Sequence, residues 1–225
     1  MRRIIVLLLF SVLAPGAGAG APDLFEEFKG DWRLKWQEER FFTRPTLYSV
    51  VADENGRSVL HARSISAHAG LVRPLELPSP TRATLRWRWK VPQALSGNDR
   101  ERTRAGDDYA ARVFVVFETS AWPLRTRAIN YVWAAREAVG AVFPSPYTRN
   151  VGMVVLRSGD TEAGVWQDER RDVLADYRNF FGASPTCITA IAILVDTDNT
   201  GKSAEAWFAG LSLASSPVPA GVAAP

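Results

Sequence analysis

The stretch that decides the fold is "LRWRWKV", residues 85–91. Apolar and basic residues alternate in it without a fault, as in a β-strand with one buried face and one exposed face. The apolar face carries Leu85, Trp87, Trp89 and Val91, and the basic face carries Arg86, Arg88 and Lys90. We therefore predict that the two tryptophans lie in a core. The role of the three cations on the opposite face is the question that the rest of the sequence has to answer.

The same period of two recurs along most of the chain. Runs rich in Val, Ile, Phe and Trp are separated by Gly, Pro, Asn and Asp, which is typical of strands joined by turns. The number of runs, about nine or ten, indicates an all-β fold, an antiparallel β-sandwich of jelly-roll type that is either galactose-binding-like or concanavalin-like. The expected strands are residues 46–53, 58–64, 69–77, 84–91, 109–118, 129–134, 150–158, 187–196 and 203–213.

Local signals refine this pattern. The pair Asn55 and Gly56 predicts a hairpin turn, and Pro74 predicts a sheet edge or a bulge. Residues 171–185 have apolar residues at helical spacing, with Asp172 as a start signal and Gly182 as a stop. We expect one short helix there, at an end of the sandwich.

Two connections are too long for plain turns. Residues 92–108 are very polar, and residues 136–148 mix apolar and aromatic side chains. Loops of this length are uncommon in compact domains unless they are functional or disordered. We expect them at an end of the sandwich or over a sheet face, where binding sites are commonly built.

The N-terminus has the pattern of a secretory signal. Arg2 and Arg3 precede a mostly apolar stretch of ten residues, and the small residues 17–19 fit a cleavage site. The sequence therefore predicts a signal peptide over residues 1–21, a single sandwich domain over 22–214 and a disordered Pro/Ala-rich tail over 215–225. We expect an exported, periplasmic protein.

Charge and cysteine content exclude several classes. The 27 basic and 24 acidic residues give a net charge of +3, and removal of Arg2 and Arg3 leaves +1, so nucleic-acid binding is not expected. No later apolar run approaches the length of about 20 residues that spans a bilayer, so membrane insertion is not expected either. The single Cys187 rules out an internal disulfide and is expected to be a buried apolar residue. The sequence leaves the oligomeric state open.

A series of short motifs resembles a known family. The motifs, in order, are "LRWRWKV", "GDDYAARVFVVFE", "INYVWA", "VVLRSG", "VWQDERRDVLADYRNFFG" and "AILVDTDNTG". Together they resemble the bacterial exported family known as domain of unknown function 3047, over residues 25–213. The resemblance implies an exported bacterial protein and carries no activity with it. The last two strands are also similar to those of jelly-roll carbohydrate-binding modules, which is an analogy of fold.

The basic face of residues 85–91 is the main candidate site. If this strand pairs with residues 109–118, its cations meet Asp108 and Arg112, and a polar groove forms that suits an acidic or polyhydroxylated ligand. The alternative is a solvated outer face with cross-strand ion pairs. The predicted ligand-binding set is Arg86, Arg88, Lys90, Asp108, Arg112 and Tyr131.

Cofactors are not expected, with one exception. The run "DTDNTG", residues 196–201, places oxygens at alternate positions, as at the start of a calcium loop. Its alternatives are an ordinary turn built on Asx hydrogen bonds and a structural calcium site at Asp196 and Asp198.

Catalytic signatures are scarce. The chain has only two histidines, His61 and His68, and none of the common motifs for nucleophilic or metal-dependent catalysis. The catalytic material is carboxylate, and the acidic run over residues 168–178 is interpreted as a solvated helix face. We expect non-catalytic binding of carbohydrate. The alternatives are a carboxylate-dependent glycan-cleaving enzyme and an envelope protein-interaction module. The carboxylates that a cleaving enzyme would draw on are Asp107, Asp108, Asp168, Glu169, Asp172 and Asp176.

Overall fold

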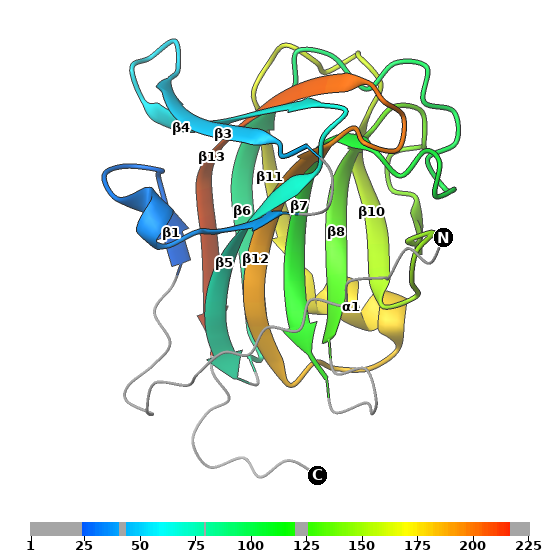
Figure 1. Ribbon diagram of the computed structural model, residues 1–225. Coiled ribbons are helices and arrows are strands. Elements are labelled where there is room, and N and C mark those ends of the chain that lie inside the picture. The colour runs from blue at the N-terminus through cyan, green and yellow to red at the C-terminus, as the bar shows by residue number, and fades with distance from the viewer. Residues whose placement is uncertain (1–23, 41–43, 79, 120–125, 217–225) are drawn as a thin grey trace, which may run out of the picture.

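The computed structural model describes residues 24–40, 44–78, 80–119 and 126–216, and in it two β-sheets face each other (Figure 1). Sheet A contains β1 (Leu24–Glu26), β3 (Leu47–Ala52), β4 (Ser58–Ile65), β6 (Arg82–Lys90), β11 (Gln167–Asp172) and β13 (Ser203–Ser216). Sheet B contains β2 (Gln37–Arg40), β5 (Ala69–Pro78), β7 (Tyr109–Glu118), β8 (Thr126–Ala134), β9 (Val142–Pro144), β10 (Val151–Ser158) and β12 (Cys187–Asp196). The other elements are helix α1 (Val173–Phe181) and the 3-10 helix η1 (Trp32–Leu34). The predicted fold class, a β-sandwich with one short helix, is confirmed.

The order of strands in sheet A is β11-β6-β13-β4-β3, with β1 also on β13, and in sheet B it is β2-β5-β12-β7-β8-β10-β9. The strand that decided the fold, β6, lies between β11 and β13. The predicted pairing of β6 with β7 is wrong, because β7 lies in the other sheet between β12 and β8. Alternation fixes which side of a strand is buried, but it does not fix the strand's neighbours.

One pair of neighbours departs from the antiparallel pattern. Strand β10 runs parallel to β8, with Val151 opposite Ala128 and Ser158 opposite Ala134. The connection between them includes β9, which pairs antiparallel with β10. This crossover uses the second of the two long connections, which is therefore part of the sheet.

The core lies between the two sheets, and the predicted burial of Trp87 and Trp89 is confirmed, with 1% and 0% of their surfaces exposed. Their rings meet edge to face at 5.5 Å between centroids. Tyr131 and Trp133 of sheet B pack against them at 5.4 and 5.9 Å. The aromatic rings therefore join the two sheets, and packing of this kind suits a chain without disulfides.

The helix and the hairpin form as their signals indicate. The Asp172 side chain accepts hydrogen bonds from the backbone N–H groups of Leu174 and Ala175, and Gly182 ends α1 in the left-handed conformation. Gly56 has a positive φ of 73° in the turn between β3 and β4. Pro74 lies opposite Ala190, where the register of β12 shifts, so its bulge is also confirmed.

Some strands were missed by the sequence analysis, and some of its predictions concern residues outside the described ranges. Strands β1, β2 and β9 were not foreseen, and the interpretation of residues 168–178 as one helix face is wrong, since their first part forms β11. The predicted signal peptide, residues 1–21, and residues 217–225 of the predicted tail lie outside the described residues. Within the described ranges, every helix is too short or too polar to cross a membrane.

Candidate functional site

The structure divides the predicted ligand-binding set among three places. Arg86, Arg88 and Lys90 lie on the outer face of sheet A, opposite in register to β11 and β13. Asp108 and Arg112 are buried at one end of sheet B, and Tyr131 points into the core. These six residues therefore do not form one site, because the strand pairing that would have joined them does not occur.

Arg112 is the centre of a buried ion-pair network. Its Nε and a terminal nitrogen donate to the two carboxylate oxygens of Asp196, each at 2.7 Å. Its other terminal nitrogen lies 3.3 Å from a carboxylate oxygen of Asp107. Burial raises the pKa of Asp107 to about 7 and also raises the pKa of Asp196, although the charge of Arg112 opposes both shifts. All three side chains are at most 7% exposed, so the network holds the end of the sandwich together.

Asp108 and Tyr131 also have structural partners. The Asp108 carboxylate accepts hydrogen bonds from the backbone and hydroxyl of Thr200, each at 2.6 Å, and so fixes the turn after β12. The Tyr131 hydroxyl donates to Asp176 at 2.7 Å, and burial raises the pKa of that tyrosine. These contacts explain why both residues are buried without requiring a ligand.

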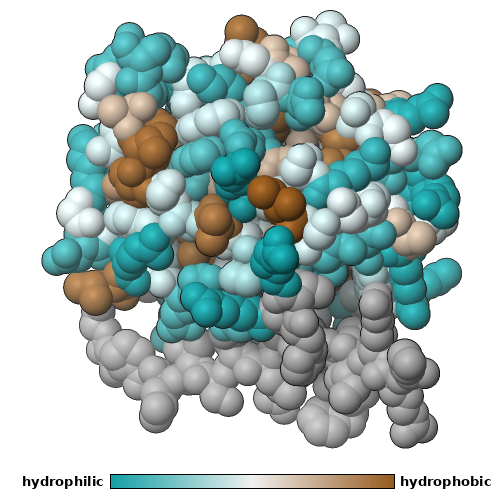
Figure 2. Space-filling model, turned by 45° about the horizontal axis from the view of Figure 1, so that its top comes forward, coloured by the Kyte–Doolittle hydropathy of each residue, from teal (hydrophilic) through white to brown (hydrophobic). Residues whose placement is uncertain are grey.

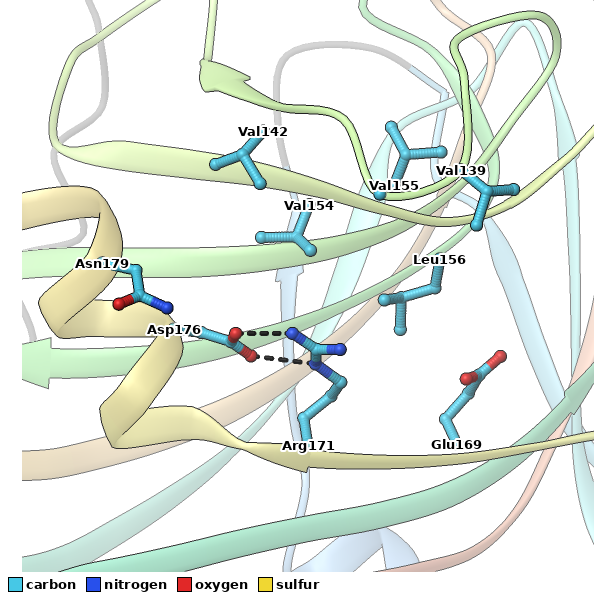
Figure 3. Close-up of a pocket in the computed structure, with 10 residues that line it drawn as sticks. Val139, Val142, Val154, Val155, Leu156, Glu169, Arg171, Asp176 and Asn179 are labelled. Atoms are coloured by element: carbon cyan, nitrogen blue, oxygen red, sulfur yellow. Dashed lines mark hydrogen bonds and ion pairs between the residues drawn. The ribbon is translucent and has the colours of Figure 1, made fainter.

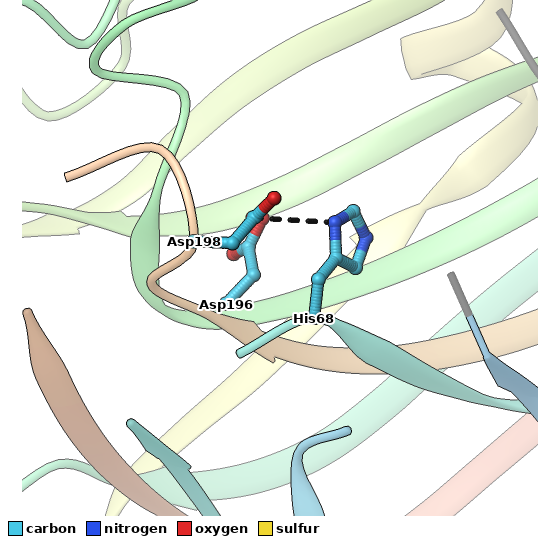
Figure 4. Close-up of side chains that lie close together, drawn as sticks. All are labelled: His68, Asp196 and Asp198. Atoms are coloured by element: carbon cyan, nitrogen blue, oxygen red, sulfur yellow. Dashed lines mark ion pairs between the residues drawn. The ribbon is translucent and has the colours of Figure 1, made fainter. Parts of the chain in front are cut away.

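The predicted calcium residues have a third neighbour. Asp196 and Asp198 lie with His68 in one cluster, and one ligand atom from each lies within 4.8 Å of the others (Figure 4). His68 Nδ1 is 3.4 Å from an oxygen of Asp198. Burial alone would lower the pKa of His68, but the hydrogen bond to Asp198 and the nearby carboxylate charges raise it. A calcium site at Asp196 and Asp198 stays a prediction. Calcium prefers oxygen ligands, and Arg112 already bonds both oxygens of Asp196, so we expect the ion pairs of this cluster to hold it without a metal.

The two long connections are tied to each other. The Glu101 carboxylate accepts hydrogen bonds from the backbone N–H groups of Ala135, Arg136 and Glu137 at 2.7 to 2.9 Å. Arg102 forms an ion pair with Glu137 at 2.6 Å. The first connection therefore packs against the second at one end of the sandwich, which is one of the two places expected for it.

An aromatic and basic row crosses the outer face of sheet A at the level of Lys90. The ammonium group of Lys90 lies 5.3 Å from the ring centroid of Trp166 and 5.3 Å from that of Trp207. Arg88 lies 4.8 Å from the Trp166 ring, and His61 stacks on Trp207 at 4.8 Å with an interplanar angle of 11°. We call these five residues the outer-face platform.

The platform spans four neighbouring strands. His61 is on β4, Trp207 on β13, Lys90 on β6, and Trp166 directly precedes β11. Register brings them to one level, since Trp207 is paired with both His61 and Lys90. Strands in a sheet lie about 4.8 Å apart, so the row is roughly 14 Å long. All its side chains are partly exposed, which leaves ring surface and charge open to solvent.

Three polar atoms of the platform are shielded from solvent and lack hydrogen bonds within the described part of the chain. They are the indole nitrogen of Trp166, Nε of Arg88 and Nε2 of His61, the last of which lies 3.5 Å from a carboxylate oxygen of Glu205. The nearest carboxylate oxygen to Arg88, on Asp168, is 3.6 Å away, too far for a hydrogen bond. The Asp168 side chain is 82% exposed, so solvent weakens its attraction for Arg88.

Sequence reasoning found Arg88 and Lys90 but missed the rings beside them. The alternation of "SAEAWFAG" places Trp207 on the face opposite Ala206 and Phe208, which could have identified it as an outward aromatic residue. Trp166 has no such signal, because its neighbours were not recognised as a strand. At the loop-bearing end of the molecule, apolar residues form small separate groups within a mostly hydrophilic surface (Figure 2). A large apolar docking surface is not visible on that side.

The fold is similar to several solved structures at low sequence identity. The family 11 carbohydrate-binding module of a cellulosomal cellulase from Clostridium thermocellum has 9% identity and a TM-score of 0.46, with 88% of this chain and 98% of that chain covered. The K1 cleaved adhesin domain of Lys-gingipain from Porphyromonas gingivalis has 12% identity and a TM-score of 0.45, over 87% and 99%. The xyloglucanase domain of NopAA from Sinorhizobium fredii has 10% identity and a TM-score of 0.44, over 80% and 93%.

Comparison at the level of sequence gives one match. No curated protein matches the chain. A family model described as "Protein of unknown function (DUF3047)" matches residues 34–212, which include every residue of the outer-face platform.

Proposed function

The chain belongs to the DUF3047 family, and on that premise we propose that it is a non-catalytic carbohydrate-binding protein whose site is the outer-face platform. The observation that carries the proposal is the position of Lys90 between the partly exposed rings of Trp166 and Trp207. Aromatic rings offer flat apolar surfaces to the C–H faces of sugars, and the cations beside them offer hydrogen bonds to hydroxyls. A row of roughly 14 Å suits an oligosaccharide laid across the strands.

The charge of the platform favours an acidic glycan. Arg88 and Lys90 stand on one strand face, and their partners Asp168 and Glu54 lie at 3.6 and 3.8 Å, beyond hydrogen-bond distance. A uronate or another anionic substituent would compensate these cations more closely. Binding should then weaken as the salt concentration rises.

Binding is favoured over cleavage by the separation of Asp168 and Glu205, two carboxylates on this face. Asp168 on β11 is paired with Arg88 on β6. Glu205 lies on β13, on the far side of β6 from β11, and two residues before the partner of Lys90. Strand geometry separates their backbones by roughly 16 Å. Glycosidases hold their two carboxyl groups about 5 to 10 Å apart. Glu205 is also engaged with Arg63 at 3.2 Å.

A binding measurement on purified protein tests the proposal. Trp207→Ala should weaken binding to an acidic polysaccharide about tenfold, the effect of one lost aromatic contact of about 1.4 kcal/mol. Phe114→Ala, on the outer face of sheet B, is the matched control and should leave affinity unchanged. Equal affinity of the Trp207 variant and the unaltered protein, or a glycan array without any binding, would overturn the proposal.

Export is the second part of the proposal. Its support is the N-terminal pattern of two arginines, a mostly apolar stretch of ten residues and then small residues, which is that of a signal peptide. We expect cleavage after Ala19 or within about two residues of it. N-terminal sequencing of protein from the bacterial envelope tests this, and a mature pool that retains Met1 would contradict it.

A further inference from the structure

A pocket of about 350 Å³ opens at one side of the sandwich, between β10, β11 and α1 (Figure 3). It lies on the other side of β11 from the outward-facing Asp168, because alternate residues of a strand point to opposite faces. Its size falls at the lower end of the range for ligand pockets, about 300–1,000 Å³, which suits a single ring.

One wall of the pocket is apolar. Val154 and Leu156 of β10 form part of it, and Val139 and Val142 stand at its edge. The two edge valines are 63% and 54% exposed, although neighbouring valines of the same sheet are buried. This wall can cover the C–H face of a small ligand.

The opposite wall is polar and comes from β11 and α1. Figure 3 shows Glu169, Arg171, Asp176 and Asn179 on this wall, across from the apolar side chains. Both oxygens of Asp176 are bonded by Arg171, at 2.9 and 2.5 Å. Arg171 and Asp176 therefore largely compensate each other's charge and hydrogen-bonding capacity.

Glu169 differs from Asp176 because only one of its oxygens is engaged. Its Oε1 accepts hydrogen bonds from the indole of Trp89 at 3.0 Å and from Arg157 at 2.7 Å. Among the described residues, no hydrogen bond or ion pair engages its Oε2. The side chain is only 9% exposed, so this oxygen belongs to a carboxylate held rigidly at the pocket wall.

The charges at the pocket leave one negative charge in excess. Glu169 and Asp176 face a single cation, Arg171. Arg157 does not correct this, because it is shared with a second carboxylate, Glu162, at 2.5 Å. A ligand with one positive charge and a small, partly apolar body would match both walls.

We propose that this pocket binds a small primary amine carried on a compact ring, with a free hexosamine as the chemical class. The ammonium group binds Glu169 Oε2, the ring packs on Val154 and Leu156, and the Asn179 amide bonds a hydroxyl. This site is separate from the outer-face platform and has the opposite charge preference. Either site can therefore fail without the other.

Ligand-detected NMR and calorimetry on the intact protein test the pocket with glucosamine, glucose and glucuronate. Glucosamine should bind, glucose should bind about tenfold more weakly, and glucuronate should not bind, since a hydrogen bond to a charged group contributes about 1.5–3 kcal/mol. Equal binding of glucose and glucosamine, or no binding of glucosamine, would overturn the proposal. The acidic polysaccharide is measured in parallel, so failure of the platform gives a different result.

Variants locate the amine. Glu169→Gln should weaken glucosamine binding about ten- to hundredfold and leave glucose binding unchanged. Glu76→Gln is the matched control, because it removes an exposed carboxylate of β5 that does not line the pocket.

A second variant avoids the buried contacts of Glu169. Val139→Arg changes an exposed edge residue and adds a cation at the pocket mouth, so it should weaken glucosamine binding without loss of stability. Leu34→Arg, at a position 85% exposed and outside the pocket, is its control. Glucosamine binding that survives both pocket variants would contradict the assignment.

Discussion

Replacement of Arg112 by leucine should remove a large part of the free energy of unfolding of this sandwich. The side chains of Arg112 and Asp196 are 5% and 2% exposed, and Asp107 is the second carboxylate on the same guanidinium. Arg112→Leu leaves two buried carboxylates without a cation, and breaking a buried ion pair in this way costs about 3–5 kcal/mol. The total stability of a domain is about 5–15 kcal/mol, so the variant should be close to the limit of folding.

Urea unfolding followed by tryptophan fluorescence measures this loss. Arg86→Leu is the matched control, because Arg86 is exposed on the outer face of sheet A and its loss should change stability by less than about 0.5 kcal/mol. The double variant Arg112→Leu with Asp196→Asn should recover part of the loss, since one uncompensated charge is then removed. A loss below about 1 kcal/mol for Arg112→Leu, or no recovery in the double variant, would refute the structural role of the network.

Three further predictions concern the core, the pH dependence and the acidic turn. Trp87→Ala should cost about 3–5 kcal/mol in urea unfolding, because the ring is 1% exposed, and an unchanged melting temperature would contradict the packing. Because burial raises the pKa of Asp107 from 3.8 to about 7, its ionisation opposes folding, so stability should fall as pH rises from about 4 to 7. Asp107→Asn should reduce that fall, and identical pH profiles would refute the shift. Millimolar calcium should leave the melting temperature unchanged, because Arg112 already compensates Asp196; an increase that Asp198→Asn abolishes would establish a calcium site instead.

The sequence predicted the buried side of each strand better than the partners of that strand. Leu85, Trp87 and Trp89 are in the core because a period of two leaves only one apolar face. The neighbour of β6 could not be found in this way, because β7 and β13 both offer an apolar face of the right length. The choice between them depends on connections and sheet order, which are properties of the whole chain.

The candidate site shows the same limit. Arg88 and Lys90 were identified from alternation, and they do lie on an outer face. Arg112 was assigned to the same place, but a buried carboxylate pair engages it in the other sheet. Trp166 was missed because the polar run after it resembled a helix, whereas its pairing with β6 makes it a strand. Long-range pairing decides such cases, and local pattern does not.

The edges of the two sheets determine how a second chain could add to this sandwich. Four edge strands resist it: β11 and β2 have the sequences QDERRD and QEER, β9 has only three residues and ends in Pro144, and β1 has only three residues and ends in Glu26. The remaining edge, β3, is uncharged along its length and exposes 65% of Leu47. Aggregation by strand pairing would therefore proceed along β3, and a lysine in place of Leu47 should suppress it.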